Sequence, residues 1–268
     1  MYQAGGRGNI DAVMPSKQDV AGLIVRLLRG IGEFVLVSLQ AVLYCFRPPF
    51  RGGLVLRQMD FIGPGSLFII MLTGVFTGAV FTLQSLYMFS KFNLETMLGA
   101  TVALALTREL SPVLAALMIT GRSGSAMATE LGTMRVTEQI DALSAMAVNP
   151  IQYLFVPRFL AAVFMFPVLA MVFNMVGIFG SYIVAVHMSG VDPGNFIAKI
   201  TWYVTGNDLI SGLVKASVFG GFITLVSCFM GYRAEGGARG VGTATTHAVV
   251  ISSVSILILD YFLTVLMY

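Results

Sequence analysis

Two charged side chains lie next to each other inside a long apolar stretch of this chain. Arg108 and Glu109 follow the apolar run that begins at Thr101, and a second apolar run continues to Thr120. A charge near the centre of a bilayer costs several kcal/mol, so such residues usually face a cavity or a partner group. Adjacent helical residues point in different directions, so the two side chains do not pair with each other. Pro112 also leaves the carbonyl of Arg108 without its helical donor. We interpret the pair as a polar spot in a mostly apolar cavity, suited to an amphiphile; the alternative is structural pairing with other helices.

A polar, helix-forming segment follows at residues 126–146, after the chain leaves the membrane through Gly121-Arg122-Ser123-Gly124. It has apolar stripes at helical spacing, with mixed charges beside them. One interpretation is a solvated amphipathic helix on the membrane surface, and the other is a helix that lies in a groove of a soluble partner. The candidate partner-contacting residues are Glu130, Leu131, Met134, Arg135, Glu138 and Asp141.

Two further charges, Lys215 and Asp260, lie inside the last two apolar stretches. Consecutive antiparallel spans are usually neighbours, and pairing is the common solution for charges at such depth. We therefore expect a structural Lys215–Asp260 ion pair. The alternatives are Lys215 reaching Glu109 and Lys215 extending to the outer surface.

Other kinds of chemistry find little support in the sequence. The chain has no GxxxxGK[ST] pattern for binding a nucleotide, and no HExxH or GxSxG pattern for hydrolysis. We interpret the glycine-rich stretch 236–242 as a flexible loop. The distant Cys45 and Cys228 are interpreted as packing residues and not as a disulfide or metal site. We therefore expect no enzyme activity, no metal and no cofactor in this chain.

Composition places the chain in a membrane. Of its 268 residues, 57% are hydrophobic and 11% are charged, whereas soluble domains average about 25% charged residues. The mean hydropathy is +0.86. Repeated apolar runs of roughly 20 residues indicate spanning helices. We expect one all-α integral membrane domain and no cleaved signal peptide.

The apolar runs predict the order of elements. A loose cytoplasmic tail at 1–15 precedes a single domain, 16–268, whose first helix at about 16–46 lies in the membrane interface; the alternative is a spanning helix. The third run is long enough to need a tilted helix, kinked at Pro167. Asp192-Pro193 predicts a cap and a short helix. Five spans are predicted at about 64–88, 96–120, 157–187, 209–232 and 247–268.

The placement of Lys and Arg predicts the orientation. Most of them precede the first span or lie in the 121–158 and 233–246 segments, whereas the opposite side has only Lys91 and Lys199. We therefore expect a cytoplasmic N-terminus and an outer, periplasmic C-terminus. In the first span, Gly74 and Gly78 form a GxxxG pattern, which we assign to packing within the chain in preference to a dimer interface.

The sequence resembles the MlaE-type permeases, the membrane subunits of ABC transporters that move phospholipids between Gram-negative membranes. The resemblance rests on ALTRELSPVLAALMITGRSGSAMATELGTMRVTEQIDALSAMAVNP at 105–150, on PRF at 157–159 and on the Asp192 loop. It continues in GVGTATTHAVV at 240–250 and ILDYFLTVLM at 258–267, and it covers roughly residues 54–268.

The resemblance implies an inner-membrane homodimer with phospholipid as its substrate. It implies a cytoplasmic ATPase that binds ATP and Mg, a STAS-domain protein, a hexameric ring of periplasmic MCE-domain protein, and no nucleic-acid partner. It implies that 126–146 is a coupling helix that docks on the ATPase. It also implies a lipid pocket lined by Phe81, Met88, Phe89, Phe92, Arg108, Glu109 and Leu110. Within this set, Phe92 occupies a position where the family resemblance leads us to expect tyrosine. A stand-alone secondary transporter or channel, and a scaffold for an MCE protein, are the alternatives.

Overall fold

The computed structural model describes residues 17–49 and 51–267, with side chains from residue 25 onward except at 26 and 27. The predicted tail and the predicted helix start at Ser16 lie outside these ranges. Within them the chain is helical, with short connections and no strand. The expected all-α membrane class is confirmed: the described residues contain five helices long and apolar enough to cross a membrane.

The first two helices are α1 (Lys17–Tyr44) and α2 (Gly52–Ser90). A long helical path then comprises α3 (Leu98–Ala105), α4 (Ser111–Ile119) and α5 (Ser125–Val136), joined by the π-helical segments Leu106–Leu110 and Thr120–Gly124. The short α6 (Gln139–Ala145) leads into α7 (Val156–Tyr182), which is flanked by π-helical segments at Ile151–Phe155 and Ile183–Met188. The chain finishes with α8 (Pro193–Tyr203), α9 (Gly206–Tyr232) and α10 (Gly237–Met267).

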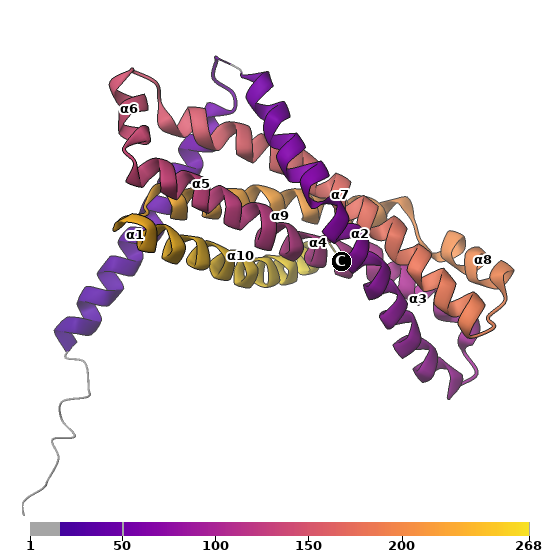
Figure 1. Cartoon of the computed structure of the whole chain (residues 1–268). Coiled ribbons are helices and arrows are strands. Elements are labelled where there is room, and N and C mark those ends of the chain that lie inside the picture. The colour runs from indigo at the N-terminus through magenta and orange to yellow at the C-terminus, as the bar shows by residue number, and fades with distance from the viewer. Residues whose placement is uncertain (1–16, 50, 268) are drawn as a thin grey trace, which may run out of the picture.

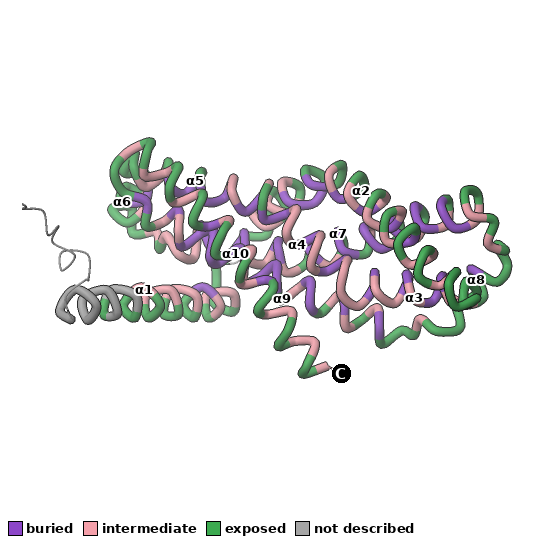
Figure 2. Tube along the Cα trace, turned by 90° about the horizontal axis from the view of Figure 1, so that it is seen from below, coloured by how far each residue is buried: buried purple, intermediate pink, exposed green. Residues whose placement is uncertain are grey.

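The long helices form an elongated bundle (Figure 1). The α6 hairpin and α1 lie at one end, and α3 and α8 lie at the other. The main core, which includes Ile70, Ile119, Phe166, Phe173 and Phe219, joins α2, α4, α7 and α9. Buried residues follow these central helices, whereas α1 and the last turns of α10 are mostly exposed (Figure 2).

Close contact between α2 and α7 explains the GxxxG pattern. A Cβ added to Gly78 would collide with the backbone of Gly177, and one added to Gly180 would collide with the backbone of Val75. A Cβ at Gly74 would lie 2.6 Å from the Val176 side chain. Small residues let helices approach closely in membranes. The assignment of this pattern to packing within the chain is therefore confirmed.

Several predicted boundaries are wrong. The second long helix does not end near Thr120 but runs unbroken from Glu95 to Val136, 42 residues in all. Arg122 stays inside this helix because its Nη1 donates to the carbonyl of Phe61 at 2.6 Å and lies 3.3 Å from Ser66 Oγ. The predicted coupling helix at 126–146 is therefore two elements, α5 and α6.

The predicted glycine-rich loop before the last span is also mostly helical. Only a short turn follows α9, where Gly236 and Gly237 adopt positive φ angles of 85° and 69°, and α10 has begun by Gly237. Likewise α2 begins at Gly52, well before the predicted 64. By contrast, the predicted start of α8 is confirmed, because Asp192 Oδ2 accepts from the Asn195 amide at 2.7 Å.

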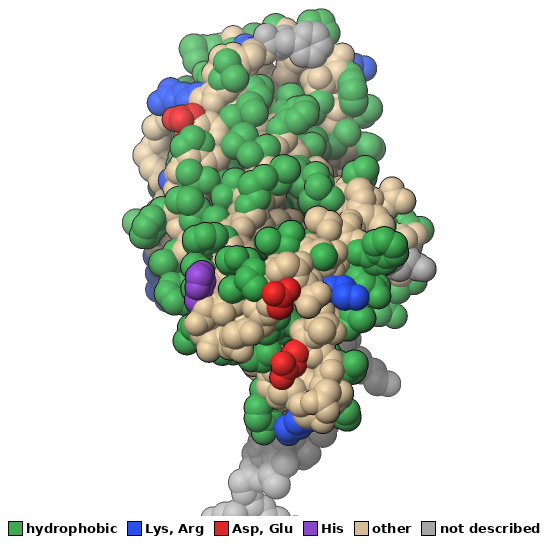
Figure 3. Space-filling model, turned by 90° about the vertical axis from the view of Figure 1, so that its right-hand side faces the viewer, with side chains coloured by type: hydrophobic (Ala, Val, Ile, Leu, Met, Phe, Trp, Pro, Cys, Tyr) green, Lys and Arg blue, Asp and Glu red, His purple; other side chains and the backbone are tan. Residues whose placement is uncertain are grey.

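The outer surface suits a hydrocarbon environment. Hydrophobic side chains cover most of the face seen in Figure 3, and charged side chains on it are few and scattered. On α10, large apolar residues are more than half exposed, including Val254, Leu257, Tyr261 and Phe262. Apolar surface of this extent on a soluble monomer would be unusual.

Candidate functional site

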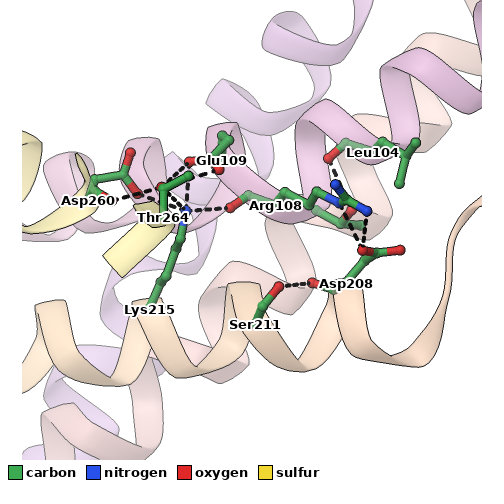
Figure 4. Close-up of polar contacts among 9 residues, drawn as sticks. Leu104, Arg108, Glu109, Asp208, Ser211, Lys215, Asp260 and Thr264 are labelled. Carbon is green, nitrogen blue, oxygen red and sulfur yellow. Dashed lines mark hydrogen bonds and ion pairs between the residues drawn. The ribbon is translucent and has the colours of Figure 1, made fainter. Parts of the chain in front are cut away.

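A cluster of charged side chains lies inside the bundle where α9, α10 and the π-helical segment Leu106–Leu110 meet (Figure 4). Lys215 of α9 is fully buried, and its Nζ lies 2.7 Å from Glu109 Oε2 and 3.1 Å from Asp260 Oδ1. The same nitrogen donates to Thr264 Oγ1 at 2.8 Å and to the carbonyl of Arg108 at 3.1 Å. Lys215 therefore connects three helices through one ammonium group.

The second pair of the cluster joins Arg108 to Asp208 at the start of α9. Arg108 Nη2 lies 2.6 Å from Asp208 Oδ1, and Arg108 Nε donates to the same oxygen at 2.8 Å. The other oxygen of Asp208 accepts from the Thr205 amide and hydroxyl, both at 2.8 Å, as the acid of a capping box. The carboxylate thus caps α9 and fixes the guanidinium at the same time.

The π-helical segment lets these adjacent residues serve different partners. The amide of Ser111 donates to the carbonyl of Leu106, which is the i→i+5 bond of a π-helix, and Pro112 offers no amide to Arg108. The Arg108 carbonyl instead accepts from Lys215. The local irregularity therefore supplies a backbone acceptor to a buried ammonium.

The cluster has a buried side and an open side. Lys215 and Asp208 are 0% and 3% exposed, whereas the side chains of Arg108 and Glu109 are 37% and 38% exposed. Arg108 and Asp208 balance formally, but Glu109 and Asp260 share the single charge of Lys215. The exposed edge therefore presents a cation beside an acidic group in otherwise apolar surroundings, an arrangement suited to a polar head group.

At the far end of the bundle, α5 and α6 form a second polar region. Arg135 Nη1 lies 2.7 Å from Asp141 Oδ1, joining the two helices across the surface. Glu130 Oε2 lies 2.8 Å from Nη2 of Arg158, whose side chain is only 5% exposed. Glu138 is exposed at the start of α6 with a φ of 60°.

Comparison with known proteins shows the family of this chain. Residues 55–266 match the family model described as Permease MlaE. The chain belongs to the MlaE permease family. A relative from Rickettsia bellii, "Probable ABC transporter permease protein", is 44% identical over 91% of this chain and 94% of its own length.

Two further relatives come from other organisms. The Haemophilus influenzae protein "Intermembrane phospholipid transport system permease protein MlaE" is 41% identical over 80% of this chain and 83% of its own length. The Arabidopsis thaliana chloroplastic protein TRIGALACTOSYLDIACYLGLYCEROL 1 is 36% identical over 93% of this chain and 69% of its own length.

The structure only partly assembles the lipid pocket expected for an MlaE permease. Leu110, Phe81 and Phe89 are partly buried and pack against the main core, whereas Met88 and Phe92 are 53% and 67% exposed. The cavity described below, between α1, α9 and α10, lies elsewhere in the bundle. The grouping of these residues with Arg108 and Glu109 around a lipid therefore stays a prediction.

The residues expected to couple an MlaE permease to its ATPase separate into two groups. Leu131 is fully buried with Ile140, Phe155 and Cys228, and Met134 packs against the same cluster. Leu131 therefore packs on the chain's own helices and is fully buried in this structure. Docking of this segment on an ATPase stays a prediction. Glu130, Arg135, Glu138 and Asp141 remain accessible.

The sequence predicted part of the charged cluster. The expected Lys215–Asp260 pair is present, and so is the Lys215–Glu109 contact that had been its alternative. Asp208 and Thr264 were missed. The signal for Asp208 was Thr205-Gly-Asn-Asp208, a capping pattern at a helix start that lies just before the predicted span 209–232.

Proposed function

We propose that this chain is the membrane-spanning permease subunit of an ABC transporter that moves phospholipids between the inner and outer membranes, while a partner subunit hydrolyses ATP. Membership of the MlaE permease family supports this. So do a relative named as a probable ABC transporter permease, which aligns over 94% of its own length, and one named as an intermembrane phospholipid transport system permease, which aligns over 83%. The chain is a multi-pass membrane protein.

The observation that carries the proposal is that the Arg108 and Glu109 side chains are partly exposed, while their partners Asp208 and Lys215 are buried. A phospholipid needs a polar contact for its head group and apolar surface for its acyl chains. Arg108 offers donors that suit a phosphate. The apolar surface of the membrane-spanning helices provides the remainder. Charged groups within spanning helices commonly mark a substrate path.

The partners follow from the same proposal. The exposed apolar face of α10 supports a second copy of this chain as one partner. The accessible charges of α5 and α6 support a cytoplasmic ABC ATPase as another. A STAS-domain protein and a periplasmic MCE-domain ring complete the proposed assembly, with the N-terminus cytoplasmic and the C-terminus periplasmic.

The test uses the permease co-expressed and purified with its ATPase and reconstituted in phospholipid vesicles. Lipid extraction and mass spectrometry should find bound phospholipid, and transport should require ATP. Glu109→Lys should abolish transport because it places a second cation beside Lys215, and Glu109→Gln should reduce it. Glu95→Lys is the matched control, since Glu95 is an exposed acid outside the cluster.

Co-purification of the ATPase shows which variants assemble. An assembled Glu109→Lys complex that transports like wild type would remove the site from the mechanism. Transport by the permease alone, without ATP, would favour a secondary transporter.

A further inference from the structure

A cavity of about 640 Å³ lies between α1, α9 and α10, far along α9 from the charged cluster. Its volume falls within the range of small-molecule sites. The helix α1 contributes Gly30, Ile31 and Phe34 to its wall. The other walls come from α9, α10 and the turn between them, and include Phe222, Phe229, Arg233, Gly240, Ala244 and Ile251.

The cavity is a groove with an apolar end and a polar end. The antiparallel α9 and α10 form two sides, with Phe222 and Ile251 at one end and Arg233 and Gly240 at the other. Phe222 and Arg233 are eleven residues apart on the α9 side, and Gly240 and Ile251 are eleven residues apart on α10. At about 1.5 Å per residue this gives a groove of roughly 16 Å, long enough for much of an acyl chain.

The helix α1 closes the groove through few contacts. Phe34 packs edge-on against Phe222 and Phe229, with ring centroids 5.9 and 5.4 Å apart. Ile31 lines the groove yet remains 60% exposed. Material in the groove would therefore add apolar contacts between α1 and the bundle.

The polar end places two arginines around one shared acid where α1 meets α9. Arg233 Nη1 lies 3.3 Å from Glu33 Oε2, and its side chain is 50% exposed. Glu33 Oε1 is also 3.1 Å from Arg29 Nε, so one carboxylate is shared between two guanidinium groups. The first turns of α10, which line this end, add the positive end of a helix dipole. Glu235, the other acid at this end, is exposed on the turn. A phosphate group complements the two arginines.

We propose that this groove is a second phospholipid site, in which an acyl chain lies between α1, α9 and α10 and the phosphate binds Arg233. Arg233 and Asp208 are twenty-five residues apart along α9, or about 37 Å, so this site is separate from the Arg108–Glu109 cluster. A lipid bound here attaches α1 to the bundle. The inference rests on the α1–α9–α10 groove alone and holds whatever the transported substrate is.

The experiment uses the full-length permease in phosphatidylcholine vesicles with a trace of phosphatidylcholine that carries a diazirine at the end of one acyl chain. After irradiation, peptide mass spectrometry should find adducts concentrated at Phe222–Val226 and Ala248–Ile251. Arg233→Ala should reduce these adducts about tenfold, the effect of losing one charge-assisted phosphate contact. Ala244→Trp, which fills the groove from α10, should reduce them similarly.

Two variants from different helices keep the test decisive if one of them does not fold. Arg239→Ala is the control, because Arg239 is exposed beside the groove but does not line it. Glu109→Lys should also leave these adducts unchanged.

Equal labelling in all variants, spread over the exposed face of α10, would mean that only surrounding bilayer lipid was labelled. Absence of lipid adducts at Phe222–Val226 and Ala248–Ile251 in the wild-type protein would mean that no lipid occupies the groove. Either result overturns the proposal.

Discussion

The charged cluster around Lys215 and the surface pair Arg135–Asp141 have similar ion-pair distances, but the first is buried and the second is exposed. Lys215 is fully buried with two carboxylates, a hydroxyl and a carbonyl within 3.1 Å, whereas Arg135 and Asp141 have side chains 35% and 62% exposed. A buried charge must be satisfied by the protein itself, while water can replace an exposed partner. The first region is therefore constrained by stability, and the second remains free for assembly.

The largest effect should come from removing the shared cation. Lys215→Met leaves Glu109 and Asp260 facing each other without a counter-charge, so we expect the free energy of unfolding to fall by about 3–5 kcal/mol. Denaturant unfolding of the purified permease in detergent measures it. Asp260→Asn is the control and should cost only about 1 kcal/mol, because Lys215 keeps Glu109. Wild-type stability in Lys215→Met would contradict the contrast between the two regions.

This control revises an expectation drawn from the sequence. With Asp260 as the partner of Lys215, Asp260→Ala should lower permease levels, and Lys215→Met with Asp260→Leu should partly restore them. Because Glu109 shares the ammonium, neutralising only Lys215 and Asp260 leaves that acid unpaired. Restoration should instead require Lys215→Met together with Glu109→Gln and Asp260→Asn, which the same unfolding measurement can show.

An intermediate effect is expected at Glu130, whose side chain is 53% exposed but whose partner Arg158 is buried. Glu130→Ala leaves a buried guanidinium with the Leu154 carbonyl, at 2.8 Å, as its remaining acceptor. The free energy of unfolding should fall by about 2 kcal/mol. Thermal unfolding with Glu95→Ala as the control tests this. A variant that loses ATPase binding but keeps full stability would make Glu130 a contact residue instead.

A smaller effect, on assembly only, is expected at Glu138. Glu138→Arg should reduce recovery of the co-purified ATPase about fivefold, which corresponds to about 1 kcal/mol. Stability should stay within about 0.5 kcal/mol, as for most surface substitutions. Glu95→Arg makes the same charge reversal elsewhere and should leave recovery unchanged. If Glu138→Arg also retains the ATPase fully, the docking surface does not include the start of α6.

The smallest effect should come from the exposed pair itself. A double-mutant cycle of Arg135→Ala and Asp141→Ala should give a coupling energy of about 0.2–1 kcal/mol by thermal unfolding, the usual range for exposed pairs. Raising the salt concentration should weaken this coupling further. A coupling above about 2 kcal/mol would show that this pair also holds the fold together and would remove the contrast with Lys215.

Sequence patterns predicted the apolar helices well because bilayer thickness sets their length and composition. They failed at Gly121–Gly124 and at 237–246, where glycine and polar residues suggested loops. There the helix continues because tertiary contacts satisfy its polar groups, as the Phe61 carbonyl does for Arg122. Local sequence contains no information about that distant acceptor.

The candidate site was predictable in its charges but not in all its pairings. Arg108, Glu109, Lys215 and Asp260 stand out because each is charged within an apolar run. That Lys215 joins two acids depends on the π-helical segment, which sets the direction of Glu109. Similarly, the apolar stripe containing Leu131 had the right helical period, but the period alone cannot tell a partner's groove from the chain's own core.

The continuous helical segment from Glu95 to Val136, which includes two π-helical stretches, connects the two regions directly. Glu109 and Arg135 lie twenty-six residues apart on it, or about 39 Å along a helical axis. When this segment tilts as one piece, a tilt of about 5° at Glu109 displaces Arg135 by about 3 Å, which is comparable to the length of a hydrogen bond. A rotation small enough to preserve most side-chain packing is therefore sufficient to make or break a contact at the far end.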